Sequence, residues 1–508
     1  MNHRQPVRIE KLSTGVPGLD ALLGGGLPEF SFNLLAGTPG SGKTTLAHQM
    51  MFSLATPTRR ALFFTVLGES PLKMLRYQQQ FPFFDFEKVN HSIKFVNLAS
   101  DLLDGHFDRV LSRILEEVQA FAPSLVFVDS FRSIVQSGHN NVAGNAGLQH
   151  LVQQLGMQMS SWQATSFLIG EYLVQEAESS PIFTVADGII WMSQMSYRDS
   201  MIRKIQVVKM RGQAQKPGLH TFKITDQGIS VFPRAVANLE SKKTDEEELT
   251  TGLKTDSTTD SSTHLPVDLP TQRMSIGNTV LDEMMGGGIP SSYSVLVVGP
   301  SGSGKTILAT QFLAEGVRAG EKGVIAAFEK SPHQLLSQKL KHLIQNGDIG
   351  VIATQNLDLS LDEIFHDIVE TIHRLNAKRL VIDSLSGFEL ALSAVFREDF
   401  REALYRMIAS LTAMGVTVLM TAELEDQYTS LRFSSYGNAF LADAIIMQRY
   451  VEIEGQLRRV ISVVKVRSSA HSKDICFYRI DEDQLCIGDR LIEYKGILSG
   501  LPELRATM

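Results

Sequence analysis

The sequence contains few cysteines, no long apolar run and no recognisable export signal. Only two of its 508 residues are cysteine, Cys476 and Cys486, which is too few for a disulfide framework and is typical of a reducing compartment. No apolar run approaches the roughly 18 residues that a membrane-spanning helix needs. The first residues lack the pattern of a secretory signal. We therefore expect a cytoplasmic protein with no membrane partner.

The sequence also lacks an excess of positive charge. It carries 48 lysines and arginines against 55 acidic residues, which gives a formal net charge of −7. A nucleic-acid-binding protein usually has a basic footprint, so the balance argues against nucleic acid as a partner. The hydrophobic fraction of 43% is that of an ordinary globular protein, and the length suits two or three domains.

What the sequence does contain is two copies of a glycine-rich phosphate-binding loop. Both fit G-x-x-x-x-G-K-[ST], and their lysines, Lys43 and Lys305, are 262 residues apart. In such loops backbone N–H groups cradle the phosphates, the lysine reaches the β- and γ-phosphates, and the Ser or Thr hydroxyl ligates Mg²⁺. We predict two sites for ATP and Mg²⁺. The candidate binding residues are Gly37, Thr38, Pro39, Gly40, Ser41, Gly42, Lys43, Thr44 and Thr45 in the first copy, and Gly299, Pro300, Ser301, Gly302, Ser303, Gly304, Lys305, Thr306 and Ile307 in the second.

The repeat extends beyond the two loops. Residues 12–20 match residues 274–282 at the same spacing, and the Gly-Gly-Gly run at 24–26 returns at 286–288. Such glycine runs permit tight turns before the strand that leads into each loop. The chain is therefore a tandem duplication.

A polar segment separates the two copies. Residues 239–272 include no aromatic residue and contain a run of Thr, Asp and Ser that cannot bury enough apolar surface to fold. We predict a flexible linker at 239–272, a first domain at 1–238 and a second domain at 273–508.

Within each copy, strand-like runs alternate with helical patterns. This alternation predicts an α/β domain with a mostly parallel sheet flanked by helices, and a ligand at the carboxyl ends of the strands. The runs that predict strands are residues 32–36, 61–66, 125–129 and 165–170 in the first copy, and residues 295–298, 324–328, 380–383 and 416–420 in the second.

Two apolar strands end in an aspartate, Asp129 and Asp383. An aspartate in this place often serves only as a helix cap. Because a phosphate-binding loop precedes each one in the same copy, we predict that both act with Thr44 and Thr306 in holding Mg²⁺.

Hydrolysis also needs a carboxylate that orients or deprotonates the attacking water. Glu69 and Glu329 follow the strand where this group is expected. When the two copies are aligned on their shared Ser-Pro, however, Glu69 aligns with Lys330, and Gly68 aligns with Glu329. The two candidate catalytic carboxylates are thus expected to differ in position, and each could instead be a solvated surface residue.

A basic pair recurs near the end of each copy. Lys209 and Arg211 follow one β-branched run, and Lys465 and Arg467 follow another. In a strand, residues two apart point to the same side, so each pair is expected to present both charges together. We predict that these cations stabilise the charge that develops on a transferred phosphoryl group.

Together these elements resemble the KaiC family of double-domain, RecA-like clock ATPases. The resemblance rests on the duplicated openings, the paired loops, the Lys-Met-Arg-Gly at 209–212, and the run from Asp443 to Ile453; it covers nearly the whole chain. It implies two tandem RecA-like P-loop NTPase domains that assemble as a homohexamer with ATP at the subunit interfaces. It also implies that Lys209, Arg211, Lys465 and Arg467 act on the neighbouring subunit's nucleotide, and that a KaiB-like protein is a partner.

The sequence departs from the family in three places. The family's double glutamate is single in each domain, with Gly68 and Lys330 in the lost places. At the family's phosphate-accepting Ser-Thr pair it has Ala439 and Phe440, which carry no hydroxyl. Ser434 and Ser435 lie nearby as possible substitutes. Only residues 501–508 follow the last shared motif, so the long tail that meets a KaiA-type activator is not expected.

Three functions remain open from the sequence. We rank an ATP-hydrolysing signalling or clock-type switch first, and a serine/threonine autokinase of the second domain second. A RecA-like nucleic-acid translocase is third, because the segments at 132–150 and 384–401 do not form a basic funnel.

Overall fold

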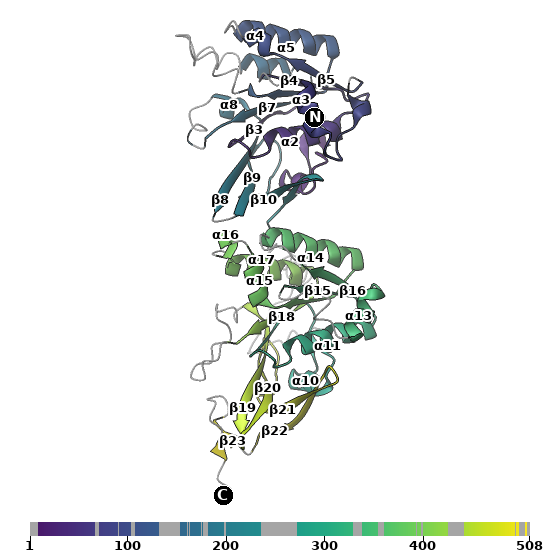
Figure 1. Ribbon diagram of the computed structural model, residues 1–508, viewed down its shortest axis with the longest axis vertical. Helices are drawn as coiled ribbons and strands as arrows, with labels where there is room; N and C mark the ends of the chain where they lie inside the picture. The colour runs from purple at the N-terminus through teal and green to yellow at the C-terminus, as the bar shows by residue number, and fades with distance from the viewer. Residues whose placement is uncertain are drawn as a thin grey trace, which may run out of the picture. The chain divides into compact units, whose positions relative to one another are not determined.

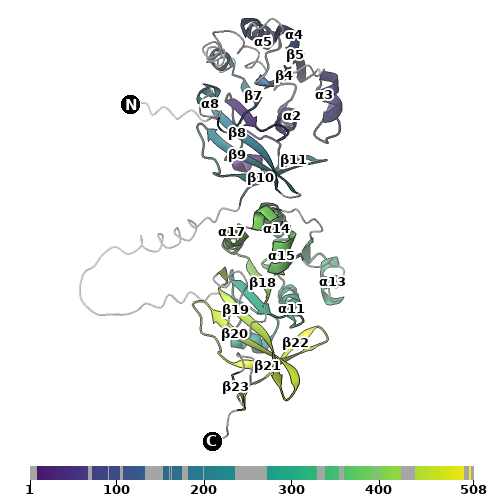
Figure 2. The same cartoon turned by 60° about the vertical axis from the view of Figure 1, so that its left-hand side comes forward.

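The computed structural model describes most of both copies. The described residues are 9–66, 71–89, 91–102, 107–131, 153–159, 161, 163–173, 175, 181–197, 200–234, 272–328, 338–353, 360–392, 394–397, 400–424, 441–492, 494–496 and 503–504. The chain divides into two compact units, Met1–Arg234 and Ala235–Met508, shown in two views in Figures 1 and 2. Nearly all of the predicted linker lies outside the described residues, so the boundaries at 238 and 273 stay predictions.

The first unit is built on a nine-stranded sheet with the order β11-β10-β9-β8-β3-β7-β6-β4-β5, and β1 and β2 form a separate pair. Its strands are β1 Lys11–Leu12, β2 Leu27–Pro28, β3 Phe32–Gly37, β4 Ala61–Thr65, β5 Ile93–Asn97, β6 Leu125–Asp129, β7 Thr165–Glu171, β8 Gly188–Tyr197, β9 Ser200–Met210, β10 His220–Thr225 and β11 Gly228–Phe232. Its helices are α1 Leu19–Leu22, α2 Lys43–Leu54, α3 Pro71–Gln78, α4 Ala99–Leu102, α5 Phe107–Phe121, α8 Pro181–Val185 and the 3₁₀ turn Phe86–Lys88.

The middle of this sheet is parallel and buried on both faces. Strands β8, β3, β7, β6, β4 and β5 pair in parallel, whereas β9, β10 and β11 add an antiparallel meander. All six residues of β3 are buried. Leu35 packs in the cluster that contains α2, and Leu34 packs in the cluster that contains α5. Because successive strand residues point to opposite faces, these two helices cover opposite sides of the sheet.

The second unit repeats this arrangement. Its nine-stranded sheet has the order β16-β15-β17-β18-β14-β19-β20-β21-β22. Its strands are β12 Arg273–Met274, β13 Ile289–Pro290, β14 Ser294–Gly299, β15 Gly323–Ala327, β16 Ile349–Ala353, β17 Arg379–Asp383, β18 Thr417–Glu423, β19 Ala444–Ile453, β20 Gln456–Val466, β21 Ile475–Asp481, β22 Gln484–Arg490, β23 Tyr494–Lys495 and β24 Glu503–Leu504. Its helices are α10 Thr279–Met284, α11 Lys305–Arg318, α13 Gln338–Gln345, α14 Leu361–Leu375, α15 Leu385–Ala391, α16 Ala394–Arg397 and α17 Phe400–Ala413.

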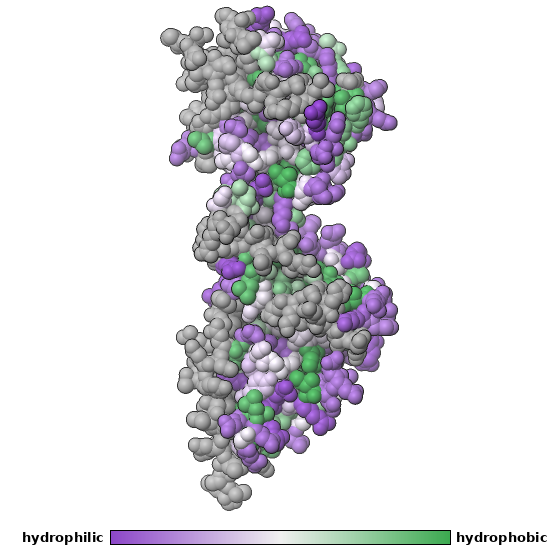
Figure 3. Space-filling model, in the orientation of Figure 1, coloured by the Kyte–Doolittle hydropathy of each residue, from purple (hydrophilic) through white to green (hydrophobic). Residues whose placement is uncertain are grey.

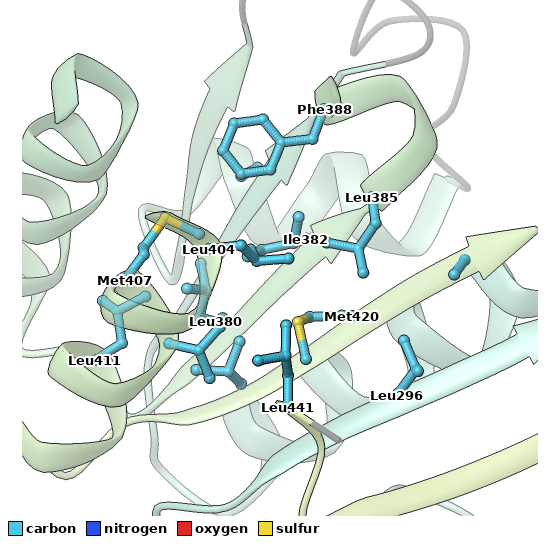
Figure 4. Close-up of a cluster of buried hydrophobic side chains, with 14 of the residues drawn as sticks. Leu296, Leu380, Ile382, Leu385, Phe388, Leu404, Met407, Leu411, Met420 and Leu441 are labelled. Carbon is cyan, nitrogen blue, oxygen red and sulfur yellow. The ribbon is translucent and has the colours of Figure 1, made fainter. Parts of the chain in front are cut away.

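The core of the second unit follows from helical and strand periodicity. Along α17, Leu404, Met407 and Leu411 recur every three or four residues and are buried together. This spacing places them on one helical face. Figure 4 shows that face against Leu380 and Ile382 of β17. Helix α11 packs on the opposite side of the sheet in a separate cluster.

The prediction of two α/β domains is confirmed. Each predicted strand is present, with ends shifted by three residues or fewer. The antiparallel meander that extends each sheet was not part of the prediction. No helix among the described residues is long and apolar enough to cross a membrane. On the face seen in Figure 3, the described residues are mostly hydrophilic, with small hydrophobic areas between them.

Candidate nucleotide-binding sites

The first phosphate-binding loop joins the carboxyl end of β3 to the start of α2. Gly37 and Gly42 have positive φ angles of 150° and 96°. A Cβ on Gly37 would lie 1.7 Å from the carbonyl oxygen of Met192, so only glycine fits there. The Lys43 ammonium donates to the carbonyls of Gly37 at 3.2 Å and Thr38 at 2.8 Å, and it is thereby held over the loop.

The second loop has the same form. Gly304 precedes α11 with a φ of 98°, and a Cβ there would lie 2.8 Å from Ile480. The Lys305 ammonium donates to the carbonyls of Gly299 and Pro300 at 2.8 and 2.9 Å. In both copies the loop lysine is buried and its ammonium curls back onto the loop's own carbonyls. Of the other candidate residues, Thr45 and Ile307 lie in the first turns of α2 and α11.

A hydroxyl and a carboxylate meet beside each loop. Oγ1 of Thr44 donates to Oδ2 of Asp129 at 2.6 Å, and Oγ1 of Thr306 donates to Oδ2 of Asp383 at 2.8 Å. Both donor sets consist of oxygen, which Mg²⁺ prefers, and both lie at the end of a glycine cradle that a Cβ would fill. The residues present therefore fit a Mg²⁺ ion carried by a nucleotide. No cluster of three or more His, Cys, Asp or Glu side chains among the described residues forms a separate metal site.

Burial shapes the electrostatics of the first site. It raises the pKa of Asp129 to about 6, although the hydrogen bond from Thr44 and the charge of Lys43 act in the opposite direction. Burial also lowers the pKa of Lys43, against the charges of Glu171 and then Asp129. Two opposite charges thus share a poorly solvated space, which favours the arrival of a metal–phosphate complex that both can bind.

Sequence reasoning missed one carboxylate in each copy. Glu171 ends β7 and lies opposite Gly37 in the strand register, and Glu423 ends β18 opposite Gly299. Both side chains are exposed. The signal was available, because Glu171 directly follows the predicted strand at 165–170 and Glu423 lies three residues after the predicted strand at 416–420. The predicted carboxylates Glu69 and Glu329 lie outside the described residues, as do Ser434, Ser435, Ala439 and Phe440.

The predicted basic pairs lie at the end of each sheet where the parallel strands begin, opposite the end that carries the phosphate-binding loop. Lys209 is the next-to-last residue of β9 and pairs with Ile189 at the start of β8. Arg211 lies just past the end of β9. The Lys209 ammonium donates to the carbonyl of Thr184 at 3.1 Å, and Arg211 pairs with Asp187 at 3.0 Å. Both side chains therefore lie at the amino-terminal ends of the parallel strands, away from the loop at 37–44.

The second unit repeats this geometry. Arg467 pairs with Asp443 at 3.4 Å, and the Lys465 ammonium donates to the carbonyl of Ala442 at 2.7 Å. A β-bulge precedes the lysine in both copies, since the register shifts at Ile189/Ile190 and at Ile445/Ile446. Bulges re-aim the side chains that follow them. Each aspartate also accepts a bond from the first residue of the loop strand, Phe32 or Ser294.

Comparison with known proteins identifies the family of both units. The family model for the KaiC ATPase matches residues 12–236 and again residues 274–491. The chain belongs to the KaiC ATPase family. It is therefore a P-loop ATPase with two nucleotide-binding domains.

Curated KaiC proteins align along nearly the whole chain. The circadian clock protein KaiC3 of Synechocystis sp. is 27% identical over 513 residues, which cover 97% of this chain and 95% of that protein. The circadian clock oscillator protein KaiC of Picosynechococcus sp. is 26% identical over 507 residues, with 97% and 92% covered. The KaiC of Rippkaea orientalis is 27% identical over 509 residues, with the same coverage.

Proposed function

We propose that the chain hydrolyses ATP as a homohexameric signalling or clock-type switch in which each site is completed by the neighbouring subunit. Thr44 and Asp129 would hold Mg²⁺ at the first site and Thr306 and Asp383 at the second, while Lys43 and Lys305 would bind the phosphates. Lys209 and Arg211, and likewise Lys465 and Arg467, would act on the nucleotide of an adjacent copy. Docking of a KaiB-like protein and a cytoplasmic location belong to the same proposal.

The observation that carries this proposal is the position of the basic pairs. Arg211 is paired with Asp187, whose other oxygen bonds the amide of Phe32, at the start of β3. The phosphate-binding loop begins at the far end of that strand. A strand rises about 3.3 Å per residue, so roughly 16 Å separate the two ends. Arg211 therefore cannot reach a phosphate in its own chain's loop while it stays on Asp187.

The basic pair is well placed for a neighbour instead. The Arg211 side chain is 61% exposed. Exposed ion pairs contribute about 1 kcal/mol or less, so transfer of Arg211 from Asp187 to a phosphate costs little. A hollow of about 470 Å³ lies beside it, lined in part by Phe32, Met157 and Asp187. A second copy that offers its loop at this hollow would bring a bound nucleotide to the guanidinium.

The chemistry then divides between two chains. When bound, Mg²⁺ would supply positive charge that offsets the charge of the phosphates. The loop's backbone N–H groups and Lys43 fix the phosphates in place, and a carboxylate such as Glu69 or Glu171 orients the water. Arg211 from the neighbour would stabilise the charge that develops on the transferred phosphoryl group.

Mixing two inactive variants tests this proposal. Lys43→Ala and Arg211→Ala, both in a Lys305→Ala chain that silences the second site, should each lack ATPase activity. After the two proteins are mixed and reassembled, part of the activity should return, because some interfaces pair an intact loop with an intact arginine. Mixing two separately prepared batches of one variant is the matched control. Absence of any recovery, in mixtures that demonstrably exchange subunits, would contradict the trans arrangement.

The proposal does not include autophosphorylation. Ala439 and Phe440 have no hydroxyl where the family accepts phosphate. Intact-mass measurement after incubation with ATP and Mg²⁺ should therefore show no added phosphate while ADP accumulates. A stable gain of phosphate would instead support the autokinase function, and peptide mapping would test Ser434 and Ser435.

A further inference from the structure

The side chains that pack around the two phosphate-binding loops differ between the two units. At three equivalent positions the second site has a polar residue that hydrogen-bonds to the site, and the first site has an apolar residue. Gln448, Tyr478 and Thr421 occupy these positions in the second unit. Their equivalents in the first unit, by strand register, are Met192, Phe222 and Ile169.

The first difference concerns the serine inside each loop. Ser303 and Ser41 are both fully buried. The hydroxyl of Ser303 donates to Oε1 of Gln448 at 3.1 Å. The hydroxyl of Ser41 has no hydrogen-bond partner among the described residues, and Met192 stands where Gln448 would be. The serine of the second loop is thus bonded to strand β19. The first loop contacts the equivalent strand β8 through other residues, since the backbone amide of Gln194 donates to Oγ1 of Thr38 and its side-chain amide donates to the carbonyl of Pro39.

The second difference concerns the backbone of the same serine. The hydroxyl of Tyr478, on β21, donates to the carbonyl oxygen of Ser303 at 2.5 Å. Burial raises the pKa of Tyr478, so the phenol stays protonated and can donate at any ordinary pH. Phe222 holds the equivalent place on β10 and has no hydroxyl. The backbone of Ser303, which lies between Gly302 and Gly304, is therefore held by a hydrogen bond. This bond limits the motion that the two glycines otherwise allow.

The third difference concerns the metal-binding aspartate. Oδ2 of Asp383 accepts a bond from Thr306, and Oδ1 accepts a second bond from the hydroxyl of Thr421. Thr421 is fully buried on β18. Ile169 replaces it in the first unit. Both oxygens of Asp383 are thus held by named partners, so the orientation of the carboxylate is fixed before any ligand arrives.

We propose that Gln448, Tyr478 and Thr421 are positioning residues that preorganise the second nucleotide site, so that it releases nucleotide more slowly than the first. Preorganisation strengthens binding because less conformational freedom is lost when the ligand arrives. The proposal rests on the proposed function, since it requires nucleotide at both sites.

Nucleotide release from the complete chain tests this inference. Chains loaded with a fluorescent ATP analogue and Mg²⁺ are mixed with excess unlabelled ATP. We expect a fast and a slow release phase, and Lys305→Ala should remove the slow one. Gln448→Met and Tyr478→Phe should each speed the slow phase by about three- to tenfold, the effect typical of one neutral hydrogen bond. The matched controls Met192→Leu and Phe222→Leu, in the first unit, should leave the slow phase unchanged.

A stability measurement separates positioning from a merely structural role. Nε2 of Gln448 is buried without a partner among the described residues, and Met fills a similar volume. Gln448→Met should therefore release nucleotide faster while its melting temperature stays equal to or above that of the parent. The inference is overturned if the Gln448→Met, Tyr478→Phe double variant keeps the parent's slow phase, or if Lys43→Ala removes that phase instead. If the parent chain binds no nucleotide at the second site, the proposed function fails there, and this inference fails with it.

Discussion

Oγ1 of Thr44 and Oδ2 of Asp129 lie 2.6 Å apart, although 85 residues separate them in the chain. Thr44 is in the first turn of α2, and Asp129 is the last residue of β6. The sheet brings them together because β6 and β3 run in the same direction and end at the same edge. The contact joins two separate sequence motifs into one set of oxygen atoms, which the proposed function assigns to Mg²⁺.

The first prediction concerns pH and Mg²⁺ at this site. Burial raises the pKa of Asp129 to about 6, and the proposed function requires its ionised carboxylate to bind Mg²⁺. Protons therefore compete with the metal below about pH 6, and Mg²⁺ affinity should fall up to tenfold for each further pH unit. The Mg²⁺ concentration for half-maximal turnover, measured in Lys305→Ala chains between about pH 5 and 8, checks this.

Asp129→Asn in the same background is the control for that prediction. The amide cannot ionise in this range, so any remaining pH dependence belongs to the nucleotide's own phosphate. If parent and variant show the same dependence of Mg²⁺ binding on pH, Asp129 is not the titrating group.

The second prediction concerns the close backbone approach at Gly37. A methyl group there would lie 1.7 Å from the carbonyl oxygen of Met192, so the loop or β8 must move. Gly37→Ala should destabilise the first unit by more than about 3 kcal/mol and abolish nucleotide binding there. Gly218→Ala is the control, since Gly218 has a φ of 95° with open space around its Cβ position. It should cost only about 1–2 kcal/mol of backbone strain in urea unfolding and leave binding intact.

Much of the fold could be predicted because it depends on local patterns. Strand β6 was predicted at Leu125–Asp129 and found with the same ends, since a β-branched and aromatic run followed by an acid indicates a buried parallel strand. The phosphate-binding loops depend on glycines and lysines at fixed spacing, so their geometry follows from the motif alone.

The rest depends on contacts that no local pattern encodes. Gln448 and Ser303 are 145 residues apart, and only the pairing of β14 with β19 brings them together. The basic pairs could be found from the sequence. Their position at the amino-terminal ends of the parallel strands, however, depends on β9 and β20 running antiparallel to β8 and β19. Glu171 could not be singled out from the sequence because a glutamate after a strand is common. Only the pairing of β7 with its neighbour β3 places it opposite Gly37.

The third prediction concerns a buried cation that supports the second unit. The Arg379 side chain is 2% exposed; it pairs with Glu321 at 2.7 Å and donates to the carbonyls of Ser275 and Phe312. Arg379→Ala removes all of these bonds and should cost about 3–5 kcal/mol of stability in chemical unfolding. Arg318→Ala removes a surface pair with Glu315 on α11 and should hardly change the transition. Similar midpoints for the two variants would contradict a structural role for Arg379.

The last prediction concerns Glu171, the carboxylate that faces Gly37. Its charge raises the pKa of Lys43 against the effect of burial, which places Glu171 within electrostatic range of the lysine and of a phosphate that the lysine would bind. Glu171→Gln removes one negative charge beside a polyanionic ligand, so ATP should bind at least as tightly as before. If the carboxylate orients the attacking water, kcat at the first site should fall by roughly 10²-fold or more.

The expected split between tighter binding and slower turnover distinguishes Glu171 from a residue that only supports the fold. Turnover and ATP affinity should be measured in Lys305→Ala chains, so that the first site alone contributes. Glu116→Gln, which changes an exposed glutamate on α5, is the control for the loss of one negative charge on the same unit. A Glu171→Gln chain with normal kcat would leave Glu69 as the sole candidate among the two carboxylates. A chain that loses ATP affinity and stability together would show instead that Glu171 holds the loop in place.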